Sequence, residues 1–414
     1  MLKDVRKLGV YVHIPFCVHK CAYCDFYSIT DTKIMREYTN ALISHIRSKK
    51  REFKKAYVDT IFFGGGTPSI LPPEYISEIL EAIRYTFKVT PDAEITLEAN
   101  PGTLDSYKLS AYLRMGINRL SLGLQSADDE ELAVMSRIHT RDEFETSYML
   151  AKMEGFQNIN IDLIYALPGQ SKAKLFDTIN YVIAMEPEHI SLYCLTIEDN
   201  TPFGRNEQIR SLIPDDEEQF DMYVSACNKL EERGYKQYEI SNFAKKTSDN
   251  EFIACKHNIK YWTNEEYIGF GPGAASFVSN MEYSYSPDVS LYISCWKDEN
   301  GIRTSDEATY ETENLLDAED LEFRFLMTGF RLRAGISIEE YNKRFGNDFE
   351  KRYGAKLEKY IKSRDIVKTD FGYRLTRKGI MRSNMILTDV LIFKEQNTSE
   401  VEKFSSTNEV KMKK

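Results

Sequence analysis

The sequence predicts an α/β protein in which six strand–helix units form a parallel sheet and a smaller α+β module follows. Two observations support this. Short apolar runs alternate with amphipathic stretches of helix length through the first half, as parallel strands with crossover helices require. Polar residues and glycines accumulate just after the strands. The pattern suits either an open doubly wound sheet or a barrel, and in a barrel these strand ends form the one face that carries the chemistry.

The predicted elements of the first half follow one another in regular order. The strands are residues 9–15, 58–63, 94–100, 119–124, 158–165 and 189–196. The helices are residues 33–50, 73–87, 104–115, several stretches up to 153, and 172–185. The strands are short apolar runs, which is typical of a sheet covered on both faces.

The pattern changes after residue 196. We expect a loop at residues 199–214, a helix at 215–233 with an acidic first turn that favours its dipole, and a strand at 238–243. Residues 256–277 are rich in glycine and aromatic residues. Residues 281–312 have no strong period and indicate a linker.

The C-terminal module has the outline of a winged helix. Its predicted helices are residues 318–333, 337–345, 349–362 and 378–385, with strands at 366–368 and 373–376. We therefore predict a domain at 1–240, a glycine- and aromatic-rich segment with the linker at 241–312, a winged-helix-like domain at 313–390, and a disordered polar tail at 394–414. A packing or lid role is the preferred interpretation of the winged helix, because the chain is acidic.

Composition excludes several classes of protein. The 414 residues include 54 basic and 64 acidic side chains, a formal net charge of −10, which argues against wholesale binding to nucleic acid phosphates. No apolar run approaches the roughly 18 residues of a membrane span, and the N-terminus lacks a secretory signal, so a cytoplasmic location is expected. Seven cysteines, an odd number in a long chain, argue against a disulfide framework.

Three of these cysteines fall within eight residues, as Cys17-x3-Cys21-x2-Cys24. Structural zinc usually takes four protein ligands, whereas three thiolates suit a cubane iron–sulfur cluster with one iron left open. A zinc site completed by His13 or His257 remains the alternative. Residues 64–68, Gly-Gly-Gly-Thr-Pro, follow the second strand, and a glycine run lets the backbone approach a ligand closely.

CxxxCxxC with a following GGGTP resembles the radical S-adenosylmethionine (SAM) superfamily. YVHIPFC narrows the resemblance to the family of oxygen-independent coproporphyrinogen III dehydrogenases and their relatives, over roughly residues 10–385. The resemblance implies a partial (β/α)6 TIM-like radical SAM barrel. It also implies that Cys17, Cys21 and Cys24 ligate a [4Fe–4S] cluster, whose open iron SAM chelates.

The same resemblance implies a SAM site made by matching motifs. Its residues are Tyr11, Tyr23, Gly65, Gly66, Thr67, Glu98, Gln125, Arg137, Asp162 and Thr196. SAM offers a carboxylate for Arg137 and hydroxyl groups for Glu98 and Gln125. Gln125 and Thr196 could instead cap strand ends, and Arg137 could be a surface helix residue. Asp162 inside an apolar strand is costly to bury unless it is paired or ligand-bound.

Two features separate the branches of this family. The dehydrogenases carry a fourth cysteine two residues past the third, where this chain has Phe26, and a longer N-terminal segment, where only ten residues precede Tyr11 here. His257-Asn258-x-x-Tyr261 resembles the HNxxY signature of the HemW-type heme chaperone branch. That branch implies His257 and Tyr261 as heme-binding residues, with Cys255 as a further candidate ligand.

The resemblance thus implies a heme chaperone with a SAM-binding [4Fe–4S] cluster, which passes heme to client apo-hemoproteins of respiratory type. An electron donor for the cluster and a peripheral membrane contact through clients are the other expected partners, with no nucleic acid. One alternative is an oxygen-independent coproporphyrinogen III dehydrogenase, so whether the chain is an enzyme stays open. The other is a zinc-containing barrel whose winged helix meets nucleic acid.

Overall fold

The computed structural model describes residues 6–246, 251–296 and 309–391. The chain divides into two compact units. The first comprises Met1–Ala226 and Glu265–Asn314, and the second comprises Cys227–Asn264 and Leu315–Lys414. The expected disordered tail, residues 394–414, lies outside the described residues, and the predicted domain boundaries at residues 240 and 312 stay predictions.

The first unit is built on the predicted parallel sheet. Its principal strands are β1 (Lys7–Ile14), β2 (Tyr57–Gly65), β3 (Lys88–Ala99), β4 (Arg119–Gln125), β5 (Ile159–Tyr165) and β6 (His189–Cys194). They are adjacent in chain order, and every pair from β1–β2 to β5–β6 is parallel. Because the order never reverses, the strands follow the (β/α)6 barrel pattern and have no switch point of a doubly wound sheet.

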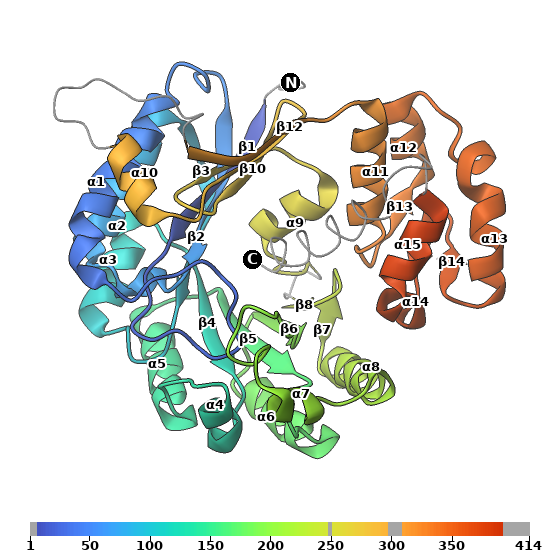
Figure 1. The fold of residues 1–414 in the computed structure, drawn as a ribbon, viewed down its shortest axis with the longest axis horizontal. Coiled ribbons are helices and arrows are strands. Elements are labelled where there is room, and N and C mark those ends of the chain that lie inside the picture. The colour runs from blue at the N-terminus through green and yellow to red at the C-terminus, as the bar shows by residue number, and fades with distance from the viewer. Residues whose placement is uncertain (1–5, 247–250, 297–308, 392–414) are drawn as a thin grey trace. The chain divides into compact units, whose positions relative to one another are not determined.

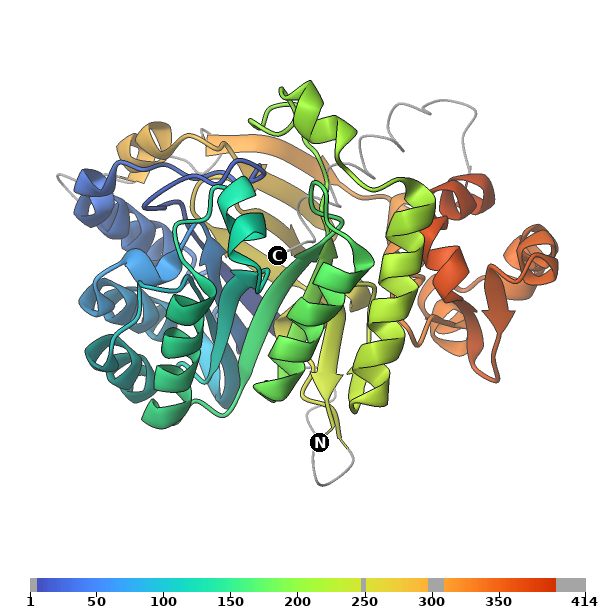
Figure 2. The same cartoon turned by 90° about the horizontal axis from the view of Figure 1, so that it is seen from below.

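The crossover helices lie on the outside of this curved sheet (Figure 1 and Figure 2). They are α1 (Met35–Ser48), α2 (Pro73–Thr86), α3 (Ser106–Met115), α4 (Asp129–Val134), α5 (Arg141–Glu154) and α6 (Lys172–Ala184). Their ends carry recognisable signals. Thr140 and Glu143 form a capping box at the start of α5, and α3 ends at Gly116 with a left-handed φ of +90°.

The sheet continues beyond β1, which corrects the predicted linker at residues 281–312. β9 (Tyr267–Phe270) pairs in parallel with β1, and β10 (Ala275–Val278) and β11 (Met281–Tyr285) follow as antiparallel strands. They are followed by α10 (Val289–Trp296) and β12 (Tyr310–Leu315), the strand that borders β11. Strands β9 to β11 have four or five residues each, too few to display a period in the sequence.

Two smaller differences concern the region after β6. The predicted loop at residues 199–214 contains the short helix α7 (Glu207–Ser211). The predicted strand at 238–243 is instead largely the turn between two antiparallel strands, β7 (Tyr235–Gln237) and β8 (Asn242–Lys245). The predicted helix between these regions is present as α8 (Asp216–Glu232).

The second unit contains the helices and the small antiparallel sheet predicted for its C-terminal part. Its helices are α9 (Lys256–Thr263), α11 (Ala318–Gly329), α12 (Ile338–Phe345), α13 (Ala355–Lys362), α14 (Arg377–Met381) and α15 (Ser383–Leu391). The strands β13 (Ile336–Ser337), β14 (Ile366–Lys368) and β15 (Gly372–Leu375) form a sheet in the order β13-β15-β14. Among the described residues of both units, no helix is long and apolar enough to cross a membrane.

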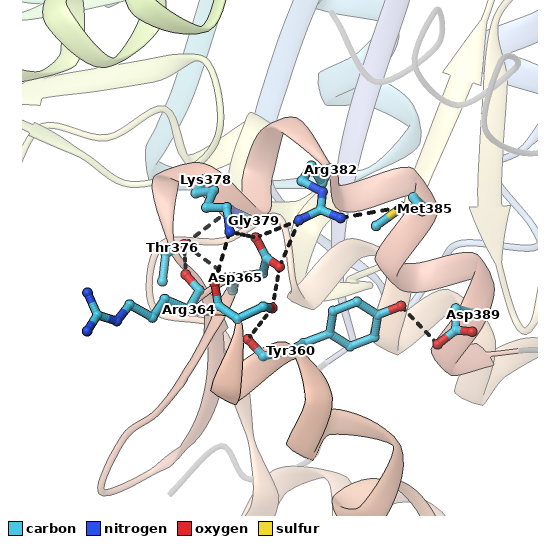
Figure 3. Close-up of polar contacts among 10 residues, drawn as sticks. Tyr360, Arg364, Asp365, Thr376, Lys378, Gly379, Arg382, Met385 and Asp389 are labelled. Carbon is cyan, nitrogen blue, oxygen red and sulfur yellow. Dashed lines mark hydrogen bonds and ion pairs between the residues drawn. The ribbon is translucent and has the colours of Figure 1, made fainter. Parts of the chain in front are cut away.

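A buried carboxylate, Asp365, ties the small sheet to α14 and the start of α15 (Figure 3). It accepts a hydrogen bond from Ser363 Oγ (2.5 Å) and lies 3.3 Å from Lys378 Nζ and 3.1 Å from Arg382 Nη1. Burial alone would raise the pKa of this carboxyl group. The hydrogen bonds from Ser363 and Lys378 and the charge of Arg382 outweigh burial and lower the pKa below its usual range.

Candidate functional site

The three clustered cysteines lie in the loop that follows β1. The Cys17 N–H donates to the Ile29 carbonyl (2.9 Å), and the Ile29 N–H donates to the Pro15 carbonyl (2.7 Å), which closes the loop at its base. Within the loop, the Cys24 N–H donates to the Cys21 carbonyl (3.2 Å). All three thiols belong to half-buried residues, so they are sheltered from water and still reachable.

The glycine run at the end of β2 packs directly against this loop. The Thr67 N–H donates to the Phe16 carbonyl (2.7 Å), and Thr67 Oγ1 lies 3.6 Å from Cys17 Sγ. A Cβ on Gly66 would meet the Phe16 carbonyl oxygen at 2.6 Å and Cys17 Sγ at 3.0 Å. Gly65 has a φ of +117°, which glycine adopts readily. A larger residue at position 66 would displace the loop that holds the first thiol.

Arg137 links the cysteine loop to the ends of β3 and β4. Its Nη1 lies 3.7 Å from Cys21 Sγ, and its Nη2 donates to Asn100 Oδ1 (2.8 Å) and to the Gly123 carbonyl (2.9 Å). Its Nε is buried and has no hydrogen-bond partner among the described residues. These contacts do not fit a surface helix residue, the alternative weighed for Arg137. A fixed guanidinium with a spare donor beside a thiol is suited to a carboxylate ligand.

The groups around Arg137 keep it charged and keep His139 neutral. Burial opposes the charge of Arg137, but Tyr23 and Cys21 outweigh burial and raise its pKa. Burial, and then repulsion by Arg137, lower the pKa of His139 to about 4. His139 Nδ1 lies 3.3 Å from Arg137 Nη2, and its Nε2 lies 3.3 Å from the Leu124 carbonyl. A neutral His139 that donates to Leu124 accepts from Arg137 and so holds the guanidinium in place.

Glu98 and Asn100 come from the end of β3. Glu98 Oε2 accepts from the Gly65 N–H (3.2 Å), so this predicted residue contacts the glycine run. Asn100 Nδ2 donates to Thr67 Oγ1 (2.8 Å) while its Oδ1 accepts from Arg137, so Asn100 joins the two sides of the site. Asn100 was not among the residues expected at this site. Its position directly after a strand end, two residues past Glu98, is the signal that could have identified it.

Asp162 lies on β5 beside this group. In the register of the sheet it is opposite Gly123 of β4, whose carbonyl accepts from Arg137. A Cβ on Gly123 would lie 2.9 Å from Gln125 Nε2, so the Gln125 side chain lies directly over Gly123. Asp162 accepts hydrogen bonds from Ser121 Oγ (2.9 Å) and Asn160 Nδ2 (2.8 Å). Burial raises its pKa, and hydrogen bonds from neutral side chains oppose the rise.

The two predicted tyrosines have different surroundings. Tyr23 packs against Phe203, with ring centroids 6.4 Å apart, and burial raises its pKa well above the usual range. Its ring joins an apolar cluster that borders the cysteine loop and includes Leu132 and Met135. Tyr11 is buried on β1, and its hydroxyl lies 3.1 Å from His13 Nδ1. Thr196, the last predicted SAM residue, lies just beyond β6 with an exposed side chain.

A hollow opens where these elements meet. Its lining residues are Val18, His19, Cys21, Thr67, Ile70, Asn100, Pro101, Thr103, Ser136, Arg137, Ile138 and His139. Val18 and Ile138 are 60% and 65% exposed, so they give the hollow an apolar margin. The second cysteine, the predicted arginine and the residue after the glycine run therefore share one cavity.

Three thiols in one loop are ligands of the kind that an iron–sulfur cubane takes, each on a different iron. Among residues 6–246, 251–296 and 309–391, no three or more His, Cys, Asp or Glu side chains are grouped so that they could hold a metal ion. Two histidines were considered as a further zinc ligand. His13 has Nδ1 3.1 Å from the Tyr11 hydroxyl and Nε2 2.9 Å from the Tyr27 carbonyl, and His257 lies on α9 of the second unit.

The predicted heme residues lie in the second unit, on α9. His257 and Tyr261 are one helical turn apart and both buried, and His257 Nε2 lies 2.9 Å from the Tyr261 hydroxyl. Cys255 precedes the helix and is also buried. The ring nitrogen that would bind an iron atom is therefore engaged with Tyr261, and a ligand at His257 has to displace that contact.

Two family models match the chain. Residues 11–182 match the radical SAM superfamily, and residues 316–382 match the HemN C-terminal domain. The first match contains the cysteine loop, the glycine run, Arg137 and Asp162. The second lies within the winged-helix-like part of the second unit.

Curated relatives are similar over most of the chain. Heme chaperone HemW of Bacillus subtilis is 33% identical over 381 residues, 91% of this chain and 97% of that protein. Heme chaperone HemW of Escherichia coli is 35% identical over 336 residues, which cover 81% of this chain and 85% of that protein. A zebrafish (Danio rerio) protein, mitochondrial radical S-adenosyl methionine domain-containing protein 1, is 29% identical over 93% of this chain and 87% of its own.

One solved structure has a similar fold over nearly the whole chain. Coproporphyrinogen III oxidase (HemN) from Escherichia coli, described as a radical SAM enzyme, superposes with a TM-score of 0.80 at 21% identity. The match covers 94% of this chain and 91% of that one. This agreement confirms the predicted fold class.

Proposed function

Because the chain belongs to the radical SAM superfamily, in the family whose curated members are named heme chaperone HemW, we propose that it binds heme and transfers it to client apo-hemoproteins. The supporting observation is the extent of the similarity, which spans 97% of the Bacillus subtilis protein. Clients of respiratory type, an electron donor for the cluster and a cytoplasmic location complete the proposal. A peripheral membrane contact would come only through the clients, and no nucleic acid partner is proposed.

We assign the [4Fe–4S] cluster to Cys17, Cys21 and Cys24. Soft thiolates are the ligands that iron–sulfur clusters take, and these three lie in a loop closed by main-chain hydrogen bonds. When bound, the cluster would supply an electron to SAM at the iron that has no cysteine. The chain's own contribution is to hold the thiols half-buried and to place Arg137 Nη1 near Cys21 Sγ.

The proposed SAM site lies on the barrel side of this loop. Arg137 would hold the SAM carboxylate with its spare Nε donor, and His139 would keep the guanidinium oriented. Glu98, Gln125 and Asp162 would accept hydrogen bonds from SAM. Gly65, Gly66 and Thr67 would let SAM approach the backbone. Tyr11, Tyr23 and Thr196 complete the proposed set, with Tyr23 and its apolar neighbours limiting access of water.

We propose His257 as the axial heme ligand, with Tyr261 as its partner or as a second ligand and Cys255 as the alternative. The contact between His257 Nε2 and the Tyr261 hydroxyl makes these roles separable. Tyr261→Phe removes a competitor for Nε2 and should increase heme retention if His257 binds the iron. The same change should lower retention if Tyr261 is the ligand, and His257→Ala should change the heme spectrum only in the first case.

The decisive test compares heme transfer with porphyrinogen chemistry. Cluster-reconstituted protein is supplied with heme and an apo-hemoprotein, and separately with coproporphyrinogen III, reductant and SAM without oxygen. We expect heme transfer and no consumption of coproporphyrinogen III, because Phe26 stands two residues after Cys24 in place of a fourth cysteine. Formation of protoporphyrinogen by the unmodified protein would favour the dehydrogenase alternative. Phe26→Cys alone should not create that activity.

A further inference from the structure

A layer of buried polar side chains lies below and beside Asp162 in the first unit's sheet. Its members are Ser121 of β4, Asn160 of β5, and His189 and Ser191 of β6, and each is no more than 5% exposed. Ser121 is opposite Asn160 and Asn160 is opposite His189 in the register, whereas Ser191 is opposite Asp162 itself. The sequence suggested no role for His189, and none of the residues proposed above to bind a ligand is in this layer.

The hydrogen bonds of the layer all run toward Asp162. Asn160 Nδ2 donates to Asp162 Oδ1 (2.8 Å), and Ser121 Oγ donates to Asp162 Oδ2 (2.9 Å). Because the Asn160 amide nitrogen faces Asp162, its Oδ1 faces β6, where it accepts from Ser191 Oγ (3.0 Å) and from His189 Nδ1 (2.6 Å). His189 therefore carries its proton on Nδ1, because Asn160 Oδ1 can only accept. Asn160 Nδ2 also donates to Ser121 Oγ (2.7 Å), the hydroxyl that in turn donates to Asp162.

The charges around Asp162 are consistent with this direction. Burial, and then the charge of Arg119 on β4, lower the pKa of His189 well below its usual range, so the ring is neutral. Arg119 also lowers the pKa of Asp162, but by less than the hydrogen bonds from Ser121, Asn160 and Ser191. Gly123, opposite Asp162 in the register, carries no side chain, and a Cβ there would meet Asn100 Oδ1 (2.9 Å), Gln125 Nε2 (2.9 Å) and Arg137 Nη2 (3.3 Å). Neutral dipoles thus hold one side of the carboxylate.

We propose that Asn160, oriented by His189 and Ser191, is a positioning residue for SAM. It holds the Asp162 carboxylate beside Gly123, where the side chains of Gln125 and Arg137 gather. An apolar layer of the same shape would pack as well without the desolvation cost of four polar side chains, which argues that the layer serves a ligand. This inference rests on the proposed SAM site, and it assigns residues that do not themselves touch SAM.

The test uses Asn160→Asp, which keeps the shape of the side chain. Its new carboxylate would face Asp162 Oδ1 at hydrogen-bond distance, and two such groups share one proton with a raised pKa. Below that pKa the shared proton replaces the lost N–H donor. Above it, SAM affinity should fall by about tenfold per pH unit. Between pH 6.5 and 8.5, a window of about two units, SAM affinity should therefore fall more steeply in Asn160→Asp than in the unmodified protein.

Calorimetric titration of SAM into cluster-reconstituted protein gives the dissociation constants at each pH. Asn206→Asp is the matched control. Asn206 is the exposed N-cap residue of α7, aspartate caps a helix as well as asparagine does, and the substitution adds the same charge. His189→Phe removes the donor to Asn160 and should weaken SAM binding by roughly three- to thirty-fold. His189→Asn, which restores a side-chain N–H, should recover most of the loss.

The outcomes separate this inference from the proposed function. If the unmodified protein does not bind SAM, the proposed SAM site is wrong. If the unmodified protein binds SAM and Asn160→Asp shows the same affinity and the same pH profile as the unmodified protein, the positioning role alone is wrong. Equal losses in His189→Phe and His189→Asn would mean that His189 fills space and does not act through its N–H.

Discussion

Asp162 in the first unit and Asp365 in the second are both aspartates with several hydrogen-bond partners inside the protein, but the charges of those partners differ. Asp365 is fully buried and meets two cations, Lys378 and Arg382, and its pKa is lowered. Asp162 is half-buried and accepts only from neutral side chains, and burial raises its pKa. The first arrangement satisfies the carboxylate completely within the protein. The second holds the carboxylate with neutral hydrogen-bond donors.

The contrast teaches how to distinguish a structural carboxylate from one that is held ready for a ligand. A carboxylate paired with cations stabilises the fold in its ionised form. A carboxylate that has only neutral hydrogen-bond donors keeps a net desolvation penalty, which a bound ligand can offset. Removing Asp365 should therefore damage the fold, and removing Asp162 should damage ligand binding. The predictions below test this division, from the largest expected effect to the smallest.

The largest effect is expected at the cysteine loop, because its thiols are the groups most directly assigned to a ligand. Replacing Cys17, Cys21 and Cys24 together by alanine should abolish the iron–sulfur absorption of anaerobically reconstituted protein, because no thiolate remains on the loop. Cys21→Ser alone should abolish it too, and Cys295→Ser should leave it unchanged. Iron–sulfur absorption that survived the triple change would place the cluster elsewhere.

Asp162→Asn should weaken SAM binding without weakening the fold. Loss of a charged hydrogen bond costs about 1.5–3 kcal/mol, roughly ten- to a hundred-fold in the dissociation constant. Because folding raises the pKa of Asp162, its ionised form costs stability above that pKa and the cost disappears as the pH falls. At neutral pH the variant should therefore melt no lower than the unmodified protein. Arg137→Ala should also weaken SAM binding while the cluster stays bound.

The matched control for that experiment is Asp177→Asn, an exposed position on α6 of the same unit. It removes one negative charge without touching the site. Equal SAM affinities in Asp162→Asn and in the control would remove Asp162 from the site. A large drop in melting temperature for Asp162→Asn would instead make it a structural residue like Asp365.

Asp365→Asn should have the opposite profile, with lower stability and unchanged SAM affinity. We expect a loss of about 1–3 kcal/mol in the free energy of unfolding at neutral pH, since the half-exposed cations lose a buried partner. Folding lowers the pKa of Asp365, so its contribution is complete above the unfolded value of 3.8 and is lost as the pH falls through the folded value. The stabilities of the two proteins, measured by urea unfolding, should thus begin to approach each other only when the pH falls below 3.8 toward the folded pKa. Asp370→Asn, in the exposed turn between β14 and β15, is the control.

The smallest effect concerns His139. Its pKa falls to about 4 on folding from an ordinary 6.5, so the unfolded chain binds the extra proton first. Stability should decrease as the pH falls from 6.5 toward 4, and His139→Gln should remove that part of the slope. Melting temperatures measured across this range check the prediction. An unchanged slope in the variant would mean that His139 is not the titrating group.

The sequence predicted the parallel core of the first unit because its strands are apolar runs between long helices. β1 to β6 are recognisable for this reason, whereas β9 to β11 are too short for any period to appear. The turn between β7 and β8 was predicted as part of one strand, whereas Gln237 and Asn242 lie on two different strands. Local pattern does not reveal which short segments will pair.

Only the part of the candidate site that forms a local sequence motif could be predicted. Cys17, Cys21, Cys24 and the glycine run are adjacent in sequence and form a motif, so they could be read directly. Asn160 and His189 are separated by 29 residues, and their meeting depends on the register of β5 and β6. The alternation of polar residues in these strands was visible, but the shared face could be seen only once the strands were paired.

The closed base of the cysteine loop has a kinetic consequence. Main-chain hydrogen bonds between Cys17 and Ile29 and between Ile29 and Pro15 order the base of the loop without the cluster. The entropy lost on closing the loop is therefore lost when the protein folds, before the cluster binds. Loading with iron and sulfide should then follow a bimolecular rate law, proportional to the concentration of the cluster donor. A loop that had to order itself first would impose a rate ceiling independent of that concentration. Stopped-flow mixing with increasing donor would reveal which law holds.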